Sequence, residues 1–100
     1  MPSRPRTLAF SEQASLFASK VRAARRALGL SQLKLAEESG VSYRQIQLIE
    51  ANSNNEPTGV TSPQPANPKL DTVYLLAAAL QVDIAYLVDP SRAVEAAPHP

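Results

Sequence analysis

The most chemically suggestive stretch of the sequence is the segment SYRQIQLIE in the middle of the chain. Ile46 and Ile49 lie three residues apart, so on a helix they share one face and can be buried together. Tyr43, Arg44 and Gln47 must then point elsewhere, and each has a long side chain that ends in a hydrogen-bonding group. The pattern favours a helix that is anchored on one face and binds a polar partner with the other.

Side chains suited to catalysis or metal binding are scarce. The sequence contains no Cys, which excludes disulfides and thiolate metal sites, and its single histidine, His99, stands next to last. It also has no Gly-rich loop that could hold a phosphate and no evident pair of carboxylates in a pocket. We therefore predict a protein that is not an enzyme and that holds neither a metal nor a cofactor.

The composition favours a small, soluble helical domain. Apolar residues make up 44% of the sequence and aromatic residues only 5%, so Leu, Ala, Val and Ile must fill most of one modest core. No apolar run approaches the roughly 20 residues of a membrane span, and we expect a cytoplasmic protein. Residues 1–50 carry eight Lys/Arg and four Asp/Glu, whereas residues 51–100 carry two and five. This asymmetry is compatible with an anionic partner for the first half.

Two capped helices joined by a short turn are predicted at the centre of the chain. Ser31 is the expected N-cap of the first helix, which ends at Gly40, and Ser42 is the expected N-cap of the second. A connection of about three to four residues that begins with Gly has the spacing of a helix-turn-helix. The residues expected to pack the first of these helices are Leu33, Ala36 and, as a further candidate, Leu35.

A longer helix is predicted before this pair. It begins near Ser11, a suitable N-cap, and stops at Gly29, which can take the positive φ of a helix C-terminus. Residues 1–10 are expected to form a flexible basic arm. Arg22 and Arg26 are expected to be solvated cations that complement the dipole of the last turns. The predicted buried stripe consists of Phe17, Val21, Ala24 and Leu28, widened by Leu16 and Ala27.

The helical period is lost after the central pair. Residues 53–67 are rich in Asn, Ser and Pro and are predicted to form a long loop, either functional or disordered. Asn67 and Pro68 then begin a fourth helix as N-cap and first residue. Asp83 caps a fifth helix, and a flexible tail is expected over residues 90–100. The apolar residues expected to face the core are Leu70, Val73, Tyr74, Leu76 or Ala77, Leu80, Ile84, Tyr86, Leu87 and Val88.

A resemblance to a known family rests on the segment LGLSQLKLAEESGVSYRQIQLIE. It is similar to the Cro/C1-type helix-turn-helix family, the xenobiotic-response-element-like (XRE-like) regulators that include phage repressors. Downstream, PKLDTVYLLAAALQVDIAYLV looks like the fourth and fifth helices of that family. The resemblance implies an all-α, five-helix domain over residues 11–89, with a long loop inserted between helices 3 and 4. The matching residues are Leu28 to Gln32, Leu35, Ala36, Gly40 to Ser42, Ile46, Ile49 and Glu50.

Family precedent implies that the third helix contacts DNA bases. Arg44 is the sharpest candidate, because a guanidinium can bind guanine O6 and N7 through two hydrogen bonds. Gln47 could pair with adenine N6 and N7. Leu48 could rest on a thymine methyl group or pack against another helix or a second subunit. Tyr43 could reach a base edge, stack on a thymine methyl group or touch only a phosphate.

The same precedent implies phosphate contacts and a structural ion pair. Gln32 resembles the phosphate-gripping glutamine at the start of the family's second helix. Further candidates for phosphate contacts are Ser31, Ser42, Lys34 and Asn55. In relatives, a salt bridge joins the positions of Arg25 and Glu50 and ties the first helix to the recognition helix. Asn52 stands where relatives usually carry Gly, and Asn tolerates the positive φ required there.

The resemblance implies a sequence-specific transcription regulator that binds double-stranded DNA. We expect a repressor that acts as a homodimer on a palindromic operator. One alternative keeps the fold but makes the protein the antitoxin of a toxin–antitoxin pair, which binds a cognate toxin and represses its own promoter. The other alternative is an adaptor that docks on a protein and never touches DNA, which the net charge of only +1 favours.

Overall fold

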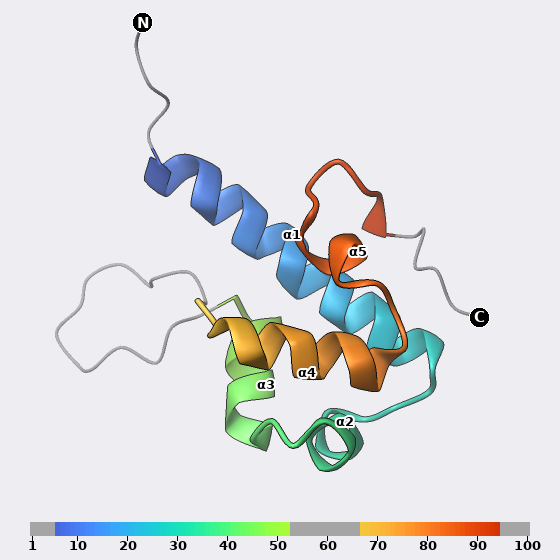
Figure 1. Ribbon diagram of the computed structural model, residues 1–100. Coiled ribbons are helices and arrows are strands. Elements are labelled where there is room, and N and C mark those ends of the chain that lie inside the picture. The colour runs from blue at the N-terminus through green and yellow to red at the C-terminus, as the bar shows by residue number, and fades with distance from the viewer. Residues whose placement is uncertain (1–5, 53–66, 95–100) are drawn as a thin grey trace, which may run out of the picture.

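The described part of the chain forms five α-helices in the order predicted from the sequence (Figure 1). The computed structural model describes residues 6–52 and 67–94, and no strand occurs among them. The predicted all-α, five-helix fold is confirmed, whereas residues 53–66 of the predicted loop lie outside the described residues. The helices are α1 (Arg6–Ala27), α2 (Gln32–Ser39), α3 (Tyr43–Glu50), α4 (Leu70–Leu80) and α5 (Ile84–Val88).

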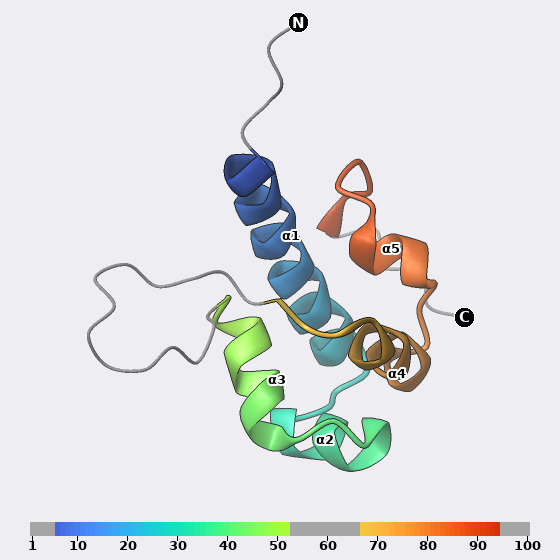
Figure 2. The same cartoon turned by 60° about the vertical axis from the view of Figure 1, so that its left-hand side comes forward.

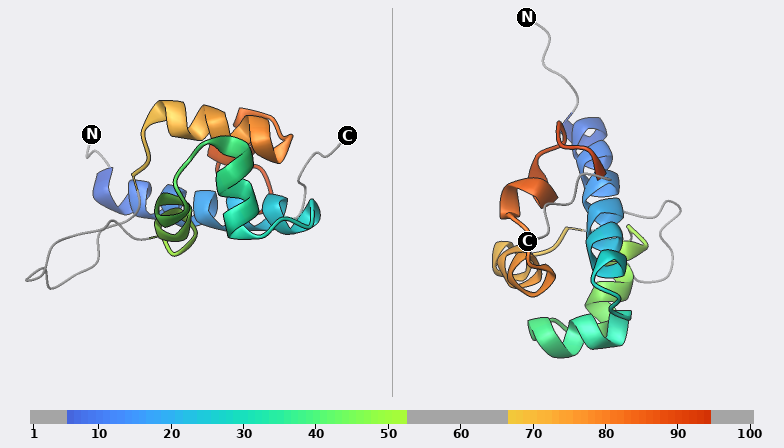
Figure 3. Two further views of the ribbon diagram at one scale, coloured as in Figure 1. Left: turned by 90° about the horizontal axis from the view of Figure 1, so that it is seen from below. Right: turned by 90° about the vertical axis from the view of Figure 1, so that its right-hand side faces the viewer.

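One hydrophobic core joins all five helices. The long α1 packs against α3, α4 and α5, while α2 packs against α3 and α4 (Figures 1 and 2). In the right-hand view of Figure 3, α4 and α5 lie on one side of α1 and α3 emerges on the other. None of the described helices is long and apolar enough to cross a membrane. The buried core residues are Phe17, Val21, Ala24, Leu35, Val41, Ile46, Ile49, Val73, Leu76, Ala77, Leu80, Tyr86 and Leu87.

The start of α1 differs from the prediction. The helix begins at Arg6 and passes through Ser11, which was wrongly predicted to be its N-cap. Leu8, Ala9 and Glu12 all favour helix, and a serine inside a helix costs only about 0.5 kcal/mol relative to Ala. The helix therefore continues through residues that were predicted to belong to a flexible arm. Of the predicted stripe, Phe17, Val21 and Ala24 are buried, Leu16 and Leu28 are half-buried, and Ala27 is exposed at the last residue of the helix.

The start of α4 also differs from the prediction. Lys69, rather than Asn67, is the residue before the helix, and it makes no side-chain capping bond. The first helical hydrogen bond runs from the N–H of Val73 to the oxygen of Lys69, so Pro68 precedes the helix instead of opening it. Leu70 consequently lies in the first turn, where it is exposed rather than packed in the core.

Several apolar side chains that were predicted to pack lie on the surface. Tyr74 is one such residue, because Val73 occupies the inner face of α4 and the next residue is turned by about 100°. Leu75 continues this outer face and is 45% exposed. Leu33 on α2 and Val88 on α5 are exposed as well, whereas Leu35, Tyr86 and both Leu76 and Ala77 are buried.

A fully buried lysine links α1 to the segment that follows α5. The Lys20 side chain has no exposed surface, and its Nζ donates to the backbone oxygen of Asp89 at 2.6 Å. The ammonium also lies 5.5 Å from the centre of the Tyr86 ring, within range of a cation–π attraction. Burial lowers the pKa of Lys20 below its ordinary value of 10.5, while the charge of Asp89 opposes this shift and that of Arg92 adds to it. The Tyr86 hydroxyl in turn donates to the oxygen of Val94.

Substitutions of Lys20 should show how much the buried side chain contributes to the stability of the fold. We expect Lys20→Ala to lower the free energy of unfolding by about 2–4 kcal/mol, because it removes a buried stem and leaves a cavity. Lys20→Met should cost less, because it keeps the volume and removes a buried charge. Urea unfolding followed by circular dichroism measures both.

The pH dependence of the stability of the wild type and of Lys20→Met provides an independent check on the burial of the Lys20 charge. Because the folded state lowers the pKa of Lys20, the unfolded chain binds more protons in the window just below pH 10.5. Stability of the wild type relative to Lys20→Met should therefore rise as the pH increases through that window. A difference that falls with pH would contradict a Lys20 pKa lowered by burial.

Candidate nucleic-acid interface

The turn between α2 and α3 has the geometry predicted from its sequence. Gly40 lies in the left-handed region at φ 78°, and its N–H donates to the oxygen of Ala36 at 3.0 Å. The following Val41 is buried and pins the turn to the core. The Ser42 hydroxyl then accepts the N–H of Gln45 at 3.1 Å, which satisfies one of the unpaired donors at the start of α3.

The two faces of α3 are separated as the residue spacing predicted. Ile46, Ile49 and Glu50 are buried against the rest of the protein. Tyr43 is 44% exposed, and Arg44 and Gln47 are exposed beside it. Leu48, the fourth candidate for a base contact, is half-buried. The helix thus presents a continuous polar surface while its inner side is held by the core.

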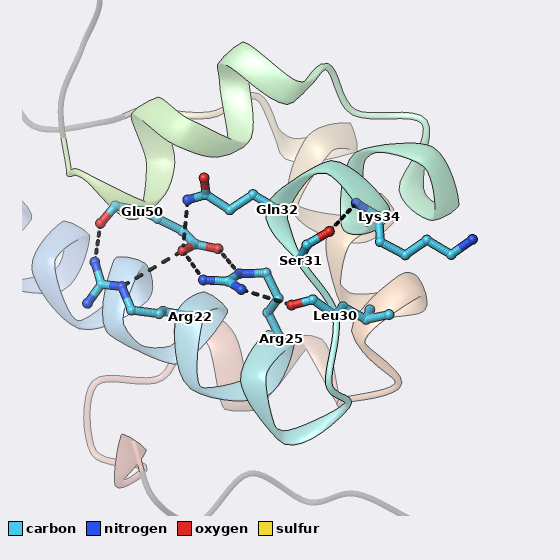
Figure 4. Close-up of polar contacts among 7 residues, drawn as sticks. All are labelled: Arg22, Arg25, Leu30, Ser31, Gln32, Lys34 and Glu50. Atoms are coloured by element: carbon cyan, nitrogen blue, oxygen red, sulfur yellow. Dashed lines mark hydrogen bonds and ion pairs between the residues drawn. The ribbon is translucent and has the colours of Figure 1, made fainter.

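A buried carboxylate connects the first three helices (Figure 4). The side chain of Glu50 is only 3% exposed, and its two oxygens accept the Nε and Nη2 groups of Arg25 at 2.7 and 2.9 Å. Gln32, the first residue of α2, donates its amide nitrogen to the same carboxylate at 3.1 Å. Arg25 also donates to the oxygen of Leu30 at 2.8 Å. The hydrogen bond with Glu50 is the main reason that the pKa of Arg25 is raised above its ordinary value.

The comparison with known protein families agrees with the geometry of α2 and α3, which is that of a helix-turn-helix. Residues 21–61 match the family described as helix-turn-helix, a span that begins within α1 and includes α2 and α3. The match identifies this part of the chain as a Cro/C1-type helix-turn-helix. A helix-turn-helix of this type supports a DNA-binding regulator in general. A search of curated proteins gave no match to this chain.

The structural features predicted by family resemblance are present in this domain. The ion pair between Arg25 and Glu50 forms through two hydrogen bonds. Asn52 has a φ of 52°, so it takes the left-handed conformation for which relatives use Gly. A second left-handed residue, Gln81 at φ 59°, ends α4 and was not predicted, because glutamine carries no sequence preference for that conformation.

Four of the five candidates for phosphate contacts lie at the starts of α2 and α3. Ser31 is exposed and accepts the N–H of Lys34 at 3.0 Å, so it caps α2 as Ser42 caps α3. The Lys34 ammonium is exposed and lies 3.7 Å from the carboxylate of Glu37. Gln32 is half-buried. Asn55 lies outside the described residues.

The prediction for Arg22 was wrong. It was expected to be a solvated cation, but its Nη2 donates to the backbone oxygen of Glu50 at the end of α3. Its Nε also lies 3.8 Å from a carboxylate oxygen of Glu50. The available signal was its spacing, because residues three apart on a helix share a face and Arg22 precedes Arg25 by three. Arg26 is exposed, as predicted.

Removing one partner of the buried ion pair should destabilise the domain strongly. Arg25→Ala leaves the Glu50 carboxylate buried without its main partner, which typically costs 3–5 kcal/mol, and we expect a loss of about this size. Arg26→Ala is the matched control, because it removes an exposed arginine from the same helix and should change stability by less than about 0.5 kcal/mol. Chemical unfolding of both variants measures the difference, and equal small losses would show that the pair does not hold the fold.

Proposed function

We propose that the protein is a sequence-specific transcription regulator that binds double-stranded DNA, and that it represses as a homodimer on a palindromic operator. The observation that carries this proposal is the outer face of α3, where Tyr43, Arg44 and Gln47 are exposed beside one another. An exposed helix fits the major groove of B-DNA, in which each base pair displays a distinct pattern of donors and acceptors.

The exposed residues of α3 are suited to different base edges. The Arg44 guanidinium can donate two parallel hydrogen bonds to guanine, and the Gln47 amide can both donate to and accept from adenine. Tyr43 lies at the first turn, where its ring can stack on a thymine methyl group or its hydroxyl can reach a base edge or a phosphate. The half-buried Leu48 can cover a thymine methyl group with the part of its side chain that remains exposed.

The helix starts supply the phosphate contacts in this proposal. The amide nitrogen of Gln32 carries two hydrogens, so it can donate to a phosphate oxygen while it also donates to Glu50. The hydroxyls of Ser31 and Ser42 accept backbone N–H groups, which leaves their own hydrogens available to donate. The exposed ammonium of Lys34 adds a positive charge. Backbone N–H groups at helix starts favour phosphate in the same way.

A second copy of the chain is required by the limited discrimination of one short helix. Two copies on a palindrome combine their base contacts, with half-sites about 34 Å apart. The apolar surface that could support such a dimer is the outer side of α4, where Leu70, Tyr74 and Leu75 are exposed. An exposed apolar patch of this kind commonly marks a protein interface.

The roles of Arg44 and Gln32 are separable by their effect on two kinds of duplex. Once a cognate duplex has been selected from a random library, Arg44→Ala should weaken its binding by about 1–3 kcal/mol and relax the preference at one base pair. Gln32→Ala should instead weaken binding to cognate and random duplexes about equally, because phosphates carry no sequence information. Fluorescence anisotropy measures both affinities. If Arg44→Ala also weakened both duplexes equally, its base-reading role would be wrong.

The dimer surface is testable with a pair of matched leucines. Leu75→Glu places a charge on the outer face of α4, and we expect it to raise the dimer dissociation constant at least about tenfold, since a buried unpaired charge costs several kcal/mol. Leu33→Glu is the control, because Leu33 is similarly exposed, at 54% against 45%, but lies on α2. Sedimentation equilibrium without DNA measures both. A monomeric wild type would contradict the homodimer itself.

The antitoxin and the protein-binding adaptor, the two alternatives to this function, predict different binding behaviour. Binding to DNA should weaken steeply as the salt concentration rises, because phosphate contacts release counterions. An adaptor would show no duplex affinity even at low salt. An antitoxin would retain DNA binding and would also co-purify with a small protein partner.

A further inference from the structure

We propose that Arg22 is a positioning residue for the recognition helix, and that it fixes where α3 lies along its own axis relative to α1. The inference rests on the proposed function, because the quantity that it controls is sequence-specific DNA binding. Arg22 was not among the predicted DNA contacts, and the helix that carries it lies behind α3, on the core side. Its hydrogen bond to α3 is made to the main chain of Glu50, and its Nε lies 3.8 Å from the carboxylate of the same residue.

The two arginines of α1 hold the same glutamate in different ways (Figure 4). Arg25 binds the carboxylate, which is separated from the backbone of α3 by the rotatable bonds of the Glu50 side chain. A contact at the end of a side chain allows the helix backbone to move while the ion pair is kept. Arg22 binds the carbonyl oxygen of the same residue, so it acts on the helix backbone directly. Together, the two contacts restrict both translation and rotation of α3.

Arg22 binds one of the carbonyl groups at the end of α3. The last carbonyls of a helix have no partner within the helix and carry partial negative charge. The oxygens of Gln47 and Ile49 are bound by the N–H groups of Ala51 and Asn52, both at 3.0 Å. The oxygen of Glu50 is bound by the Arg22 guanidinium, whose positive charge also complements the helix dipole.

Small displacements of α3 matter because base readout is geometrically demanding. A binding constellation must be held within about 0.5 Å of its productive position by residues that support it. If α3 slides along its axis, Arg44 and Gln47 shift together relative to the base edges, whereas flexible phosphate contacts can adjust. Loss of Arg22 should therefore reduce specific binding more than non-specific binding.

Because Arg22 is partly exposed, a direct contact with a DNA phosphate is a rival role, and the test must distinguish it from positioning of α3. Its side chain is 37% exposed, so it could also reach a DNA phosphate. A phosphate contact would weaken binding to all duplexes and reduce the dependence of log K on log salt by about one unit. A positioning role leaves that slope the same as in a variant that has lost an exposed arginine elsewhere.

Arg22→Gln, compared with Arg26→Gln, tests the proposal. Both variants lose one positive charge from α1, but Arg26 is exposed, and its side chain makes no hydrogen bond or ion pair with α3 among the described residues. We expect Arg22→Gln to weaken binding to the selected cognate duplex at least about tenfold relative to Arg26→Gln, with equal affinities for a scrambled duplex and equal salt slopes. Arg22→Lys, which keeps a charged donor, should restore most of the lost preference. Thermal unfolding verifies that all three variants are folded.

Hydrogen exchange provides a readout that does not require DNA. In Arg22→Gln, the amides of Ile49, Ala51 and Asn52 should exchange faster than in the wild type, and in Arg26→Gln they should not. Unchanged exchange in Arg22→Gln, or an unchanged ratio of cognate to scrambled affinity, would overturn the positioning role. Equal losses on both duplexes with a reduced salt slope would replace it with a phosphate contact. A wild type that prefers no duplex would contradict the proposed function, whereas the exchange result would still decide whether Arg22 anchors α3.

Discussion

The buried carboxylate of Glu50 is the interaction on which the arrangement of the first three helices depends. An ionised group that is 3% exposed is tolerable only when its charge and lone pairs are satisfied. Here Arg25 supplies two hydrogen bonds from α1 and Gln32 supplies one from α2. Because each bond has a directional requirement, the three helices can meet in few ways. The hydrophobic core alone would tolerate many more arrangements, since apolar burial is non-directional.

This arrangement also explains how a short helix can be exposed on one side and still be held in place. α3 is too short to be stable by itself, and tertiary packing must hold it. Ile46 and Ile49 provide that packing on one side, and the contacts to Glu50 hold the last turn. The other side carries the exposed side chains of Tyr43, Arg44 and Gln47, which lie outside the hydrophobic core.

The sequence was a reliable guide wherever a local physical requirement acts on a single residue. Gly40 and Asn52 take the left-handed conformations expected of them, and Ser31 and Ser42 cap the helices that follow. The predictions failed where several positions were locally acceptable. Ser11 can start a helix or lie within one, and its neighbours favour helix, so α1 begins at Arg6.

The side chains of α4 show a second limit of prediction from sequence, which is the choice of the buried face. Its sequence is apolar on nearly every side, so the 3.6-residue period does not identify a unique inner face. Leu70 and Tyr74 were placed in the core by this reasoning, and both are exposed. Only the positions of α1, α2 and α5 determine which side of α4 is covered. The same ambiguity applied to Leu33 and Leu35 on the short α2, of which only Leu35 is buried.

The sequence by itself determined the five helices, the turn that joins α2 to α3, and the separation of α3 into an anchored and an exposed face. These features follow from backbone preferences and from periodicity, which act over a few residues. The tertiary structure decided that Arg22, Arg25 and Gln32 all donate hydrogen bonds to Glu50. It also decided which apolar side chains remain on the surface. Arg22 and Glu50 are 28 residues apart, and no local rule specifies whether an arginine meets solvent or the end of another helix. That outcome depends on how the helices pack, because only packing brings a donor to a carbonyl group so distant in the chain.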